Sequence, residues 1–310
     1  MSDSPPSPTA PPAPAFSALA AIALCSLIWG TTWYAVTLQL GQVAPVVSVA
    51  YRFGLAAAIL FAVCVARRQP IRLSRTQHAA VFLQGLLTFA IQYPLVYLAE
   101  ERVPSAVVAV IFAALAFVNL ALFRVLLGQS ATRDAWLGSA LGVLGVAALF
   151  VGELRRTAFD SAALIGLATA AAAVVFSAGG NLAAFRAQMR GAPVLASTAW
   201  AMAYGAGAVA LFGLVTGVEW SFEATPRYVL SLLYLSVFGS VVAFGVYFAL
   251  ARARGYALAS YISALTPPVA VGVSVAFEGA RFGIEALAGL ALVLLGQGLM
   301  IRAARSRAAP

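Results

Sequence analysis

The sequence predicts an all-α integral membrane protein of ten transmembrane helices that form two repeated halves. The first observation is composition: 63% of the 310 residues are hydrophobic and only 9% are charged. Soluble domains average about 45–50% apolar and about 25% charged residues. The second observation is a series of apolar runs near the length of about 20 residues that crosses a bilayer. The third is an internal repeat, and together they favour lipid as the solvent of most side chains.

The apolar runs set the expected organisation of the chain. Turn residues and charges separate them, as at Arg67–Arg75, Glu100–Pro104 and Arg186–Pro193. The expected units are a disordered Pro-rich tail over 1–14, a first five-helix repeat over 15–152, a second over 162–302 and a cytoplasmic tail over 303–310. The predicted helices are 15–38, 44–66, 77–99, 104–127, 134–152, 162–186, 194–215, 227–250, 256–277 and 283–302.

The net charge of +9 does not indicate a nucleic-acid partner. All 19 basic residues are arginine, and most lie between apolar runs rather than on one face. Cys25 and Cys64 fall within apolar runs and have no partner at metal-ligand spacing. We therefore expect no metal and no cofactor. The expected partners are a small-molecule substrate and the lipid bilayer, and the pattern allows a monomer.

Arginine counts on alternate sides predict the orientation, because positive residues concentrate in cytoplasmic loops. With the N-terminus in the cytoplasm, the inner segments hold 13 arginines and the outer loops hold 5, while Arg52 falls within a span. Eight of the ten acidic residues fall outside. This split predicts a multi-pass protein of the cytoplasmic membrane with both termini in the cytoplasm.

An internal match relates residues 106–145 to residues 257–296 at an offset of 151 positions. Eleven of 40 residues are identical without a gap, and Gly128, Gly138 and Gly145 match Gly279, Gly289 and Gly296. Five helices per half is an odd number, so the second half must enter the membrane from the opposite side. Inverted repeats are a recurrent transporter design with a substrate site between the halves.

Several short motifs resemble the drug/metabolite transporter superfamily in its EamA-like form. The first half carries Trp29-Gly30-Thr31-Thr32-Trp33, Pro45, Arg52-Phe53 and the Gly128, Gly138 and Gly145 series. The second half carries Leu265-Thr266-Pro267, Phe277-Glu278-Gly279 and the Gly289 and Gly296 pair. The resemblance covers about residues 16–302. The acidic residue that usually follows the turn glycine is replaced by Gln129 and Ala280.

The resemblance implies ten helices in two inverted five-helix repeats with both termini in the cytoplasm. Bacterial members of that family are mostly metabolite exporters, and amino-acid exporters, including an aromatic branch, are prominent among them. The resemblance therefore implies a transporter and not an enzyme.

Polar and aromatic side chains within the spans are the candidates for a substrate site, because polar groups in hydrocarbon are costly and mark a pathway or a buried partner. Stripes on several helices indicate a shared cavity, although hydrogen bonding between packed helices would give the same pattern. The expected substrate-binding residues are Trp29, Trp33, Gln84, Thr88, Gln92, Asn119, Ser177, Asn181, Ser240, Phe244, Tyr261 and Thr266.

Two further features bear on the mechanism. Pro94, Pro267 and Pro268 free backbone carbonyls one turn earlier and are expected as kinks or hinges. Arg52 is the charge that falls well inside a span. It could bind a substrate carboxylate, but a structural role near the membrane interface is favoured.

The resulting hypothesis is an inner-membrane exporter of small metabolites, with neutral or aromatic amino acids favoured, that works by alternating access. Without a carboxylate in mid-span, uniport-like movement is expected, and without lysine there is no Walker-type ATP site. The alternatives are a proton-coupled multidrug or nucleotide-sugar-type transporter and, from another class, a membrane scaffold or an intramembrane enzyme.

Overall fold

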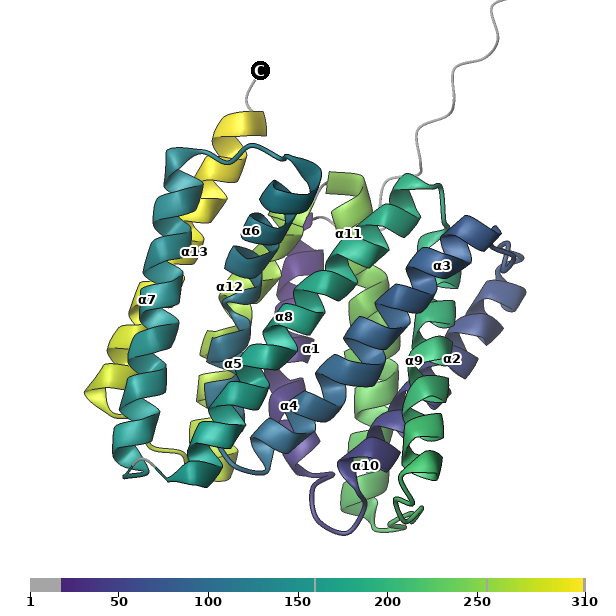
Figure 1. The fold of residues 1–310 in the computed structure, drawn as a ribbon, viewed down its shortest axis with the longest axis horizontal. Coiled ribbons are helices and arrows are strands. Elements are labelled where there is room, and N and C mark those ends of the chain that lie inside the picture. Colours follow the sequence, from purple (N-terminus) through teal and green to yellow (C-terminus); the bar gives the residue numbers. More distant parts are fainter. Residues whose placement is uncertain (1–17, 159, 255, 309–310) are drawn as a thin grey trace, which may run out of the picture.

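The described residues form ten membrane-spanning helical segments (Figure 1). The structure is a computed structural model. It describes the backbone of residues 18–158, 160–254 and 256–308, and the side chains of these except 256–258, 260–261, 263–264, 301 and 304–308. The tail expected over 1–14 and the side chain of Tyr261 lie outside this description. Eight segments of 20–29 residues are long and apolar enough to cross a bilayer, and shorter apolar stretches continue the series at Leu265–Glu278 and Ile284–Met300.

The ten segments follow the predicted order. The first half contains α1 (Ala18–Thr37), α2 (Pro45–Ala66), a third segment of α3 (Arg75–Gln84), η1 (Gly85–Gln92) and α4 (Tyr93–Glu100), a fourth of α5 (Ser105–Phe112) and α6 (Leu115–Leu127), and α7 (Arg133–Arg156). The second half contains α8 (Ser161–Met189), α9 (Val194–Val215), an eighth segment of α10 (Pro226–Tyr234), η2 (Leu235–Val242) and α11 (Ala243–Arg254), a ninth of α12 (Tyr256–Val273) and η3 (Ser274–Glu278), and α13 (Ile284–Ala308). The last helix thus continues past residue 302.

The outward faces of these helices carry large apolar side chains. Leu19, Val125 and Val215 are each more than three-quarters exposed, and Leu144 and Leu295 are more than half exposed. A water-facing surface would expose such groups at a cost, whereas hydrocarbon accepts them and requires only that backbone groups be paired within each helix. The exposed belt is therefore the lipid-facing surface.

The repeated glycines bring α7 and α13 together at one edge of the bundle (Figure 1). A Cβ on Gly138 would lie 2.5 Å from the carbonyl oxygen of Gly296, and a Cβ on Gly145 would lie 2.5 Å from that of Gly289. Only glycine permits such close backbone approach. The repeat equates Gly138 with Gly289 and Gly145 with Gly296, so a two-fold rotation exchanges the two contacts. The interface thus confirms that the halves are inverted.

The remaining glycine of each series, which comes first in the sequence, ends a helix. Gly128 follows α6 with φ +65°, and Gly279 follows η3 with φ +64°. This left-handed conformation strains residues that carry a Cβ, and glycine adopts it without that cost. Each glycine therefore stops a span at the turn that leads into the last helix of its half.

Two π-helical segments occupy matching places in the halves. η1 begins at residue 85 and η2 at residue 235, 150 positions apart, and each has eight residues. Pro94 lies in the first turn of α4, directly after η1. Pro267 and Pro268 lie inside α12, about two turns before η3. Widened turns of this kind leave backbone groups loosely paired and are frequent at functional sites. The role of these prolines as hinges stays a prediction.

The fourth span is interrupted between α5 and α6. The amides of Ala113 and Ala114 bond three residues back rather than four, to Val110 and Ile111. The carbonyl of Ala113 instead accepts a hydrogen bond of 2.9 Å from Nε2 of Gln297 on α13. A break within a membrane is tolerated where protein groups satisfy the freed backbone. Gln297 supplies that group, and the break adjoins the cavity described below.

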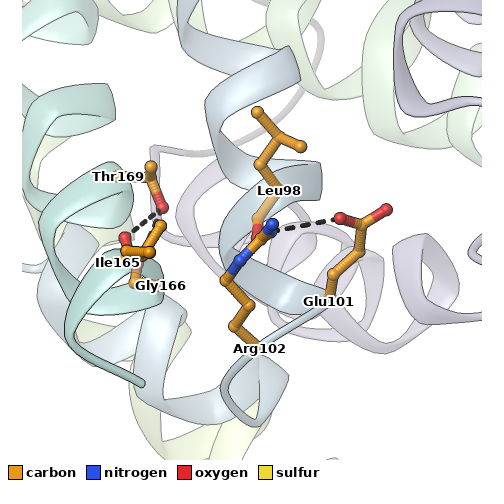
Figure 2. A network of polar contacts seen from close by, with 6 residues as sticks. All are labelled: Leu98, Glu101, Arg102, Ile165, Gly166 and Thr169. Atoms are coloured by element: carbon orange, nitrogen blue, oxygen red, sulfur yellow. Dashed lines mark hydrogen bonds and ion pairs between the residues drawn. The ribbon is translucent and has the colours of Figure 1, made fainter. Parts of the chain in front are cut away.

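The end of α4 lies beside the first turns of α8, and each has polar contacts of its own there (Figure 2). Arg102 donates from Nη1 to the carbonyl of Leu98 at 2.6 Å and to Glu101 at 3.1 Å, which satisfies a free carbonyl at the helix end. A Cβ on Gly166 would lie 2.9 Å from Cβ of Arg102. The absence of that Cβ lets α8 start close beside the end of α4.

Candidate functional site

A cavity lies within the bundle, between the two halves, and is open at one mouth. The atom-free space inside it and at its open mouth is about 850 Å³, of which about 100 Å³ can hold the centre of a water-sized sphere. Its walls come from both halves of the described chain. The lining residues are Trp29, Thr32, Trp33, Val36, Arg52, Thr88, Gln92, Tyr93, Val96, Ala109, Phe112, Ala113, Leu115, Ser177, Asn181, Phe244, Tyr247 and Thr266.

Aromatic rings form two contacting groups on the cavity wall. Trp29 of α1 packs against Phe244 and Tyr247 of α11, with ring centroids 5.2 and 5.3 Å apart. Its indole nitrogen donates to the carbonyl of Gly239 at 3.2 Å, which ties α1 to η2. Trp33, one turn later on α1, packs against Phe112 at 5.0 Å. Such edge and tilted contacts stabilise a rigid apolar wall.

Polar groups face the cavity from η1, α8 and α12. Thr88 and Gln92 of η1 and Ser177 and Asn181 of α8 are all at least nine-tenths buried. Thr88 approaches the backbone of Gly180, where a Cβ would collide with its hydroxyl oxygen, so this glycine allows η1 and α8 to meet at the cavity. Together with the aromatic wall, these groups can hold a ligand that has an apolar body and a polar head.

Eight of the twelve predicted substrate-binding residues line this cavity. They are Trp29, Trp33, Thr88, Gln92, Ser177, Asn181, Phe244 and Thr266. Whether they bind substrate stays a prediction, but the structure brings them together.

Three of the predicted residues do not line the cavity. Gln84 is buried one turn before Thr88, where η1 begins. Asn119 accepts a bond of 3.5 Å from Asn181 and lies behind it. Ser240 is fully buried and accepts a hydrogen bond of 3.1 Å from Arg52. Ser240 and Asn119 thus contact cavity residues without lining the cavity themselves. The side chain of Tyr261 lies outside the described residues.

Sequence reasoning did not include several lining residues in the predicted site. Tyr93 and Phe112 are ordinary apolar positions in the sequence, and no local signal separates them from core aromatics. Arg52 did carry a signal, because a charge within a span is costly, but its place near the start of α2 favoured a structural role. In the structure it is 1% exposed and borders the cavity.

The fold and the cavity define a class of protein: a multi-pass membrane transporter built from inverted five-helix repeats, with its site where the halves meet. A comparison with protein families agrees with this class. The model of the EamA-like transporter family matches residues 16–151 and 164–302. The chain belongs to this family, and the two matched segments correspond to the two repeats.

Individual relatives are similar over most of the chain. The uncharacterized inner membrane transporter YedA of Escherichia coli K12 is 27% identical over 272 residues, which cover 87% of this chain and 84% of YedA. Protein PagO of Salmonella typhimurium LT2 is 25% identical over 266 residues, 81% of each chain. A crystal structure with 19% identity superposes with a TM-score of 0.70 and covers 94% of this chain and 99% of that one. That likeness shows the fold.

Proposed function

We propose that this transporter exports small metabolites by alternating access, with neutral and aromatic amino acids as the favoured substrates. The observation that carries the proposal is the cavity, whose walls come from both halves and combine aromatic rings with buried polar groups. Movement of one half against the other would open such a cavity to each side of the membrane in turn. Trp29, Trp33 and Phe244 suit a bulky apolar body.

The energetics proposed for this movement are uniport-like. Among the described residues that line the cavity, none is a carboxylic acid that could carry a proton with the substrate. Glu100 is buried where α4 ends, but it is not one of the lining residues. Substrate would then flow down its own gradient, and a dependence on the proton gradient would point to Glu100 as the first group to substitute.

The proposed location is the inner membrane with both termini in the cytoplasm. Support comes from the printed name of YedA, which places that relative in the inner membrane, and from the 13-to-5 distribution of arginines. Fusing a reporter that is active only in the cytoplasm or only outside it to each terminus tests the orientation. Activity of an outside reporter at either end would contradict it.

The transport test uses the purified full chain in liposomes loaded with radiolabelled phenylalanine. We expect efflux above that of protein-free liposomes loaded in the same way. The initial rate should be the same whether or not a pH gradient is imposed. Trp29→Ala removes a cavity wall and should lower the rate by about tenfold. Trp136→Ala is the matched control, because Trp136 is 47% exposed on α7 and does not line the cavity.

Three results would count against parts of this proposal. Strict dependence on the pH gradient would remove the uniport mechanism. Efflux of cationic dyes or nucleotide sugars in place of amino acids would replace the substrate class. An equal loss of efflux rate in Trp29→Ala and Trp136→Ala would show that the substrate does not pass through the cavity.

A further inference from the structure

Arg52 is a buried cation on the wall of the cavity. It lies on α2, is 1% exposed, and is the charged residue among the described lining residues. Arginine does not lose its proton in proteins, so its charge persists wherever the chain places it. A buried charge is costly unless it is paired and hydrogen-bonded. The contacts of this guanidinium therefore decide what it is for.

Those contacts leave the guanidinium incompletely paired. Nε donates to Oγ of Ser240 at 3.1 Å, and the hydroxyl of Ser240 donates in turn to the carbonyl of Leu235 at 2.9 Å. The guanidinium carbon lies 4.6 Å from the ring centroid of Tyr93 and 5.0 Å from that of Phe53. Nη1 is buried without a hydrogen-bond partner among the described residues. The hydroxyl groups of Tyr93 and Tyr97 also interact with the guanidinium, so neutral groups hold the side chain and Nη1 is left without a partner in that part of the chain.

The chain itself does not complete the pair. The ion pairs of the described residues do not include Arg52. Glu100 feels the charge of Arg52 but makes no hydrogen bond to it, and both of its oxygens are unpaired among the described residues. An anion at Nη1 would have to come from outside the chain. Nη1 itself is covered in this conformation, so an anion from the cavity would reach it only after the surrounding side chains move.

Two other cavity residues carry unpaired buried groups. Nε1 of Trp33 has no acceptor and Oε1 of Gln92 has no donor within the described part of the chain. Buried polar atoms in native proteins are nearly always paired, so unpaired ones call for an explanation. Three such groups bordering one cavity are explained together if a ligand pairs them. The set comprises two donors, one of them charged, and one acceptor.

We propose that Arg52 anchors the carboxylate of the transported substrate, and that Gln92 accepts a hydrogen bond from its amino group. This inference rests on the proposed transport function and narrows it to monocarboxylates with an apolar body. A guanidinium binds planar carboxylates through two parallel bonds. One cation neutralises one negative charge, so a nucleotide sugar with a diphosphate would retain excess charge beside aromatic walls.

Only a small part of the Arg52 side chain is exposed in this conformation, and this fits an alternating-access cycle. Gly239 of η2 lies beside the guanidinium, and a Cβ there would be 3.4 Å from Nη2 and 2.8 Å from Cγ2 of Thr32. Gly239 thus packs against both Arg52 and Thr32 of α1, so the guanidinium lies where the first half meets η2 of the second half. Relative movement of the halves would change how much of the guanidinium faces the cavity.

The test measures binding of three probes to the purified full chain by thermal unfolding at matched ionic strength. L-phenylalanine carries a carboxylate and an ammonium group, 3-phenylpropionate only the carboxylate, and L-phenylalaninamide only the ammonium group. We expect the two carboxylates to stabilise the wild type, with phenylalanine the stronger, and the amide to bind about 10- to 100-fold more weakly, as expected for loss of charged hydrogen bonds.

Variants separate anchoring from a structural role. Arg52→Gln should weaken both carboxylates by about 10- to 100-fold and leave the weak amide binding unchanged. Arg52→Lys keeps the charge without the planar guanidinium, so its preference for acid over amide should be intermediate. This variant serves as the readout if Arg52→Gln does not fold. Arg124→Gln, an exposed arginine at the end of α6, is the control and should behave as wild type.

Three outcomes would overturn the inference. The first is amide binding as tight as acid binding in the wild type, and the second is no binding of any probe. The third is an equal loss for all three probes in the Arg52 variants. If 3-phenylpropionate binds in an Arg52-dependent manner but no amino acid is transported, the proposed substrate class fails while the carboxylate anchor stands.

Discussion

The interface between α7 and α13 and the central cavity differ in how they use the inverted repeat. At the interface, the two halves contribute equivalent glycines, and each contact has a symmetric copy. At the cavity, the halves contribute unlike groups. The first half brings Arg52, Thr88 and Gln92, whereas the second brings Ser177, Asn181 and Phe244.

This difference separates what holds the fold from what recognises a ligand. Backbone contact between glycines depends on shape alone, so it is satisfied equally by both copies of the repeat. A single substrate without internal symmetry needs a donor in one place and an acceptor in another. We therefore expect substitutions at the interface to remove folded protein, and substitutions at the cavity to change transport in a protein that still folds.

Gly296→Val should have the largest effect. The new Cβ would collide with the carbonyl oxygen of Gly138, and backbone cannot move aside as a flexible side chain can. We expect destabilisation of about 3 kcal/mol, at the upper end of ordinary overpacking, with little monodisperse protein recovered. Fluorescence-detected size exclusion and thermal unfolding in detergent measure both quantities.

Two matched variants sharpen this prediction. Gly298→Val lies two residues along the same helix, where a Cβ would meet nothing within 4 Å, and should fold as wild type. Gly145→Val breaks the symmetric copy of the contact and should match Gly296→Val. Similar behaviour of Gly296→Val and Gly298→Val would show that the glycine contact is not what holds the two helices together.

The sequence predicted the inverted repeat well because its signal is local and repeated, but it did not predict the contact between α7 and α13. Gly128, Gly138 and Gly145 recur at one offset, and an odd number of spans per half requires inversion. The structure adds the pairing of Gly138 with Gly296, which depends on how α7 and α13 cross and cannot be obtained from spacing. The π-helical turn at η2 was also not predictable, since no proline marks it as Pro94 marks η1.

Gln297→Leu should have the next largest effect. It removes the donor that satisfies the carbonyl of Ala113 at the break between α5 and α6. An unpaired buried carbonyl costs about 1–3 kcal/mol, so we expect a loss of thermal stability of that size. Gln297→Glu, a change of similar shape without the amide donor, should be at least as unstable. Stability equal to wild type in both variants would mean that the freed carbonyl finds another partner.

The candidate site was predicted only in part, for a physical reason. Stripes such as Thr88 and Gln92 report which face of a span is polar, and that face does turn toward the cavity. The stripes do not report depth, so Gln84 belongs to the same stripe but does not line the cavity. Asn119, the single candidate on its span, does not line it either. Arg52 was placed by its distance from the helix start, whereas its role depends on Ser240 and Tyr93 from distant spans.

Thr88→Val should change transport more than stability. Thr88 lines the cavity, its hydroxyl lies against Gly180, and valine nearly preserves the shape there. Loss of one neutral hydrogen bond to substrate corresponds to about 0.5–1.5 kcal/mol, which is about a 2- to 10-fold rise in KM for efflux. Thr169→Val is the matched control on α8, because Thr169 bonds only to carbonyls of its own helix, Ile165 and Gly166 (Figure 2). An equal rise of KM in both variants would show that the effect does not come from the cavity.

Asn119→Ala should have the smallest effect, below about twofold on KM. Its bond to Asn181 is 3.5 Å long, at the limit where a hydrogen bond contributes little, and it does not line the cavity. Asn181→Ala, which changes a lining residue, should raise KM by about 2- to 10-fold. If Asn119→Ala matches Asn181→Ala, then Asn119 meets substrate in another state of the cycle. The asymmetric region would then be larger than the cavity of this conformation and would include Asn119, which the sequence predicted as a substrate-binding residue.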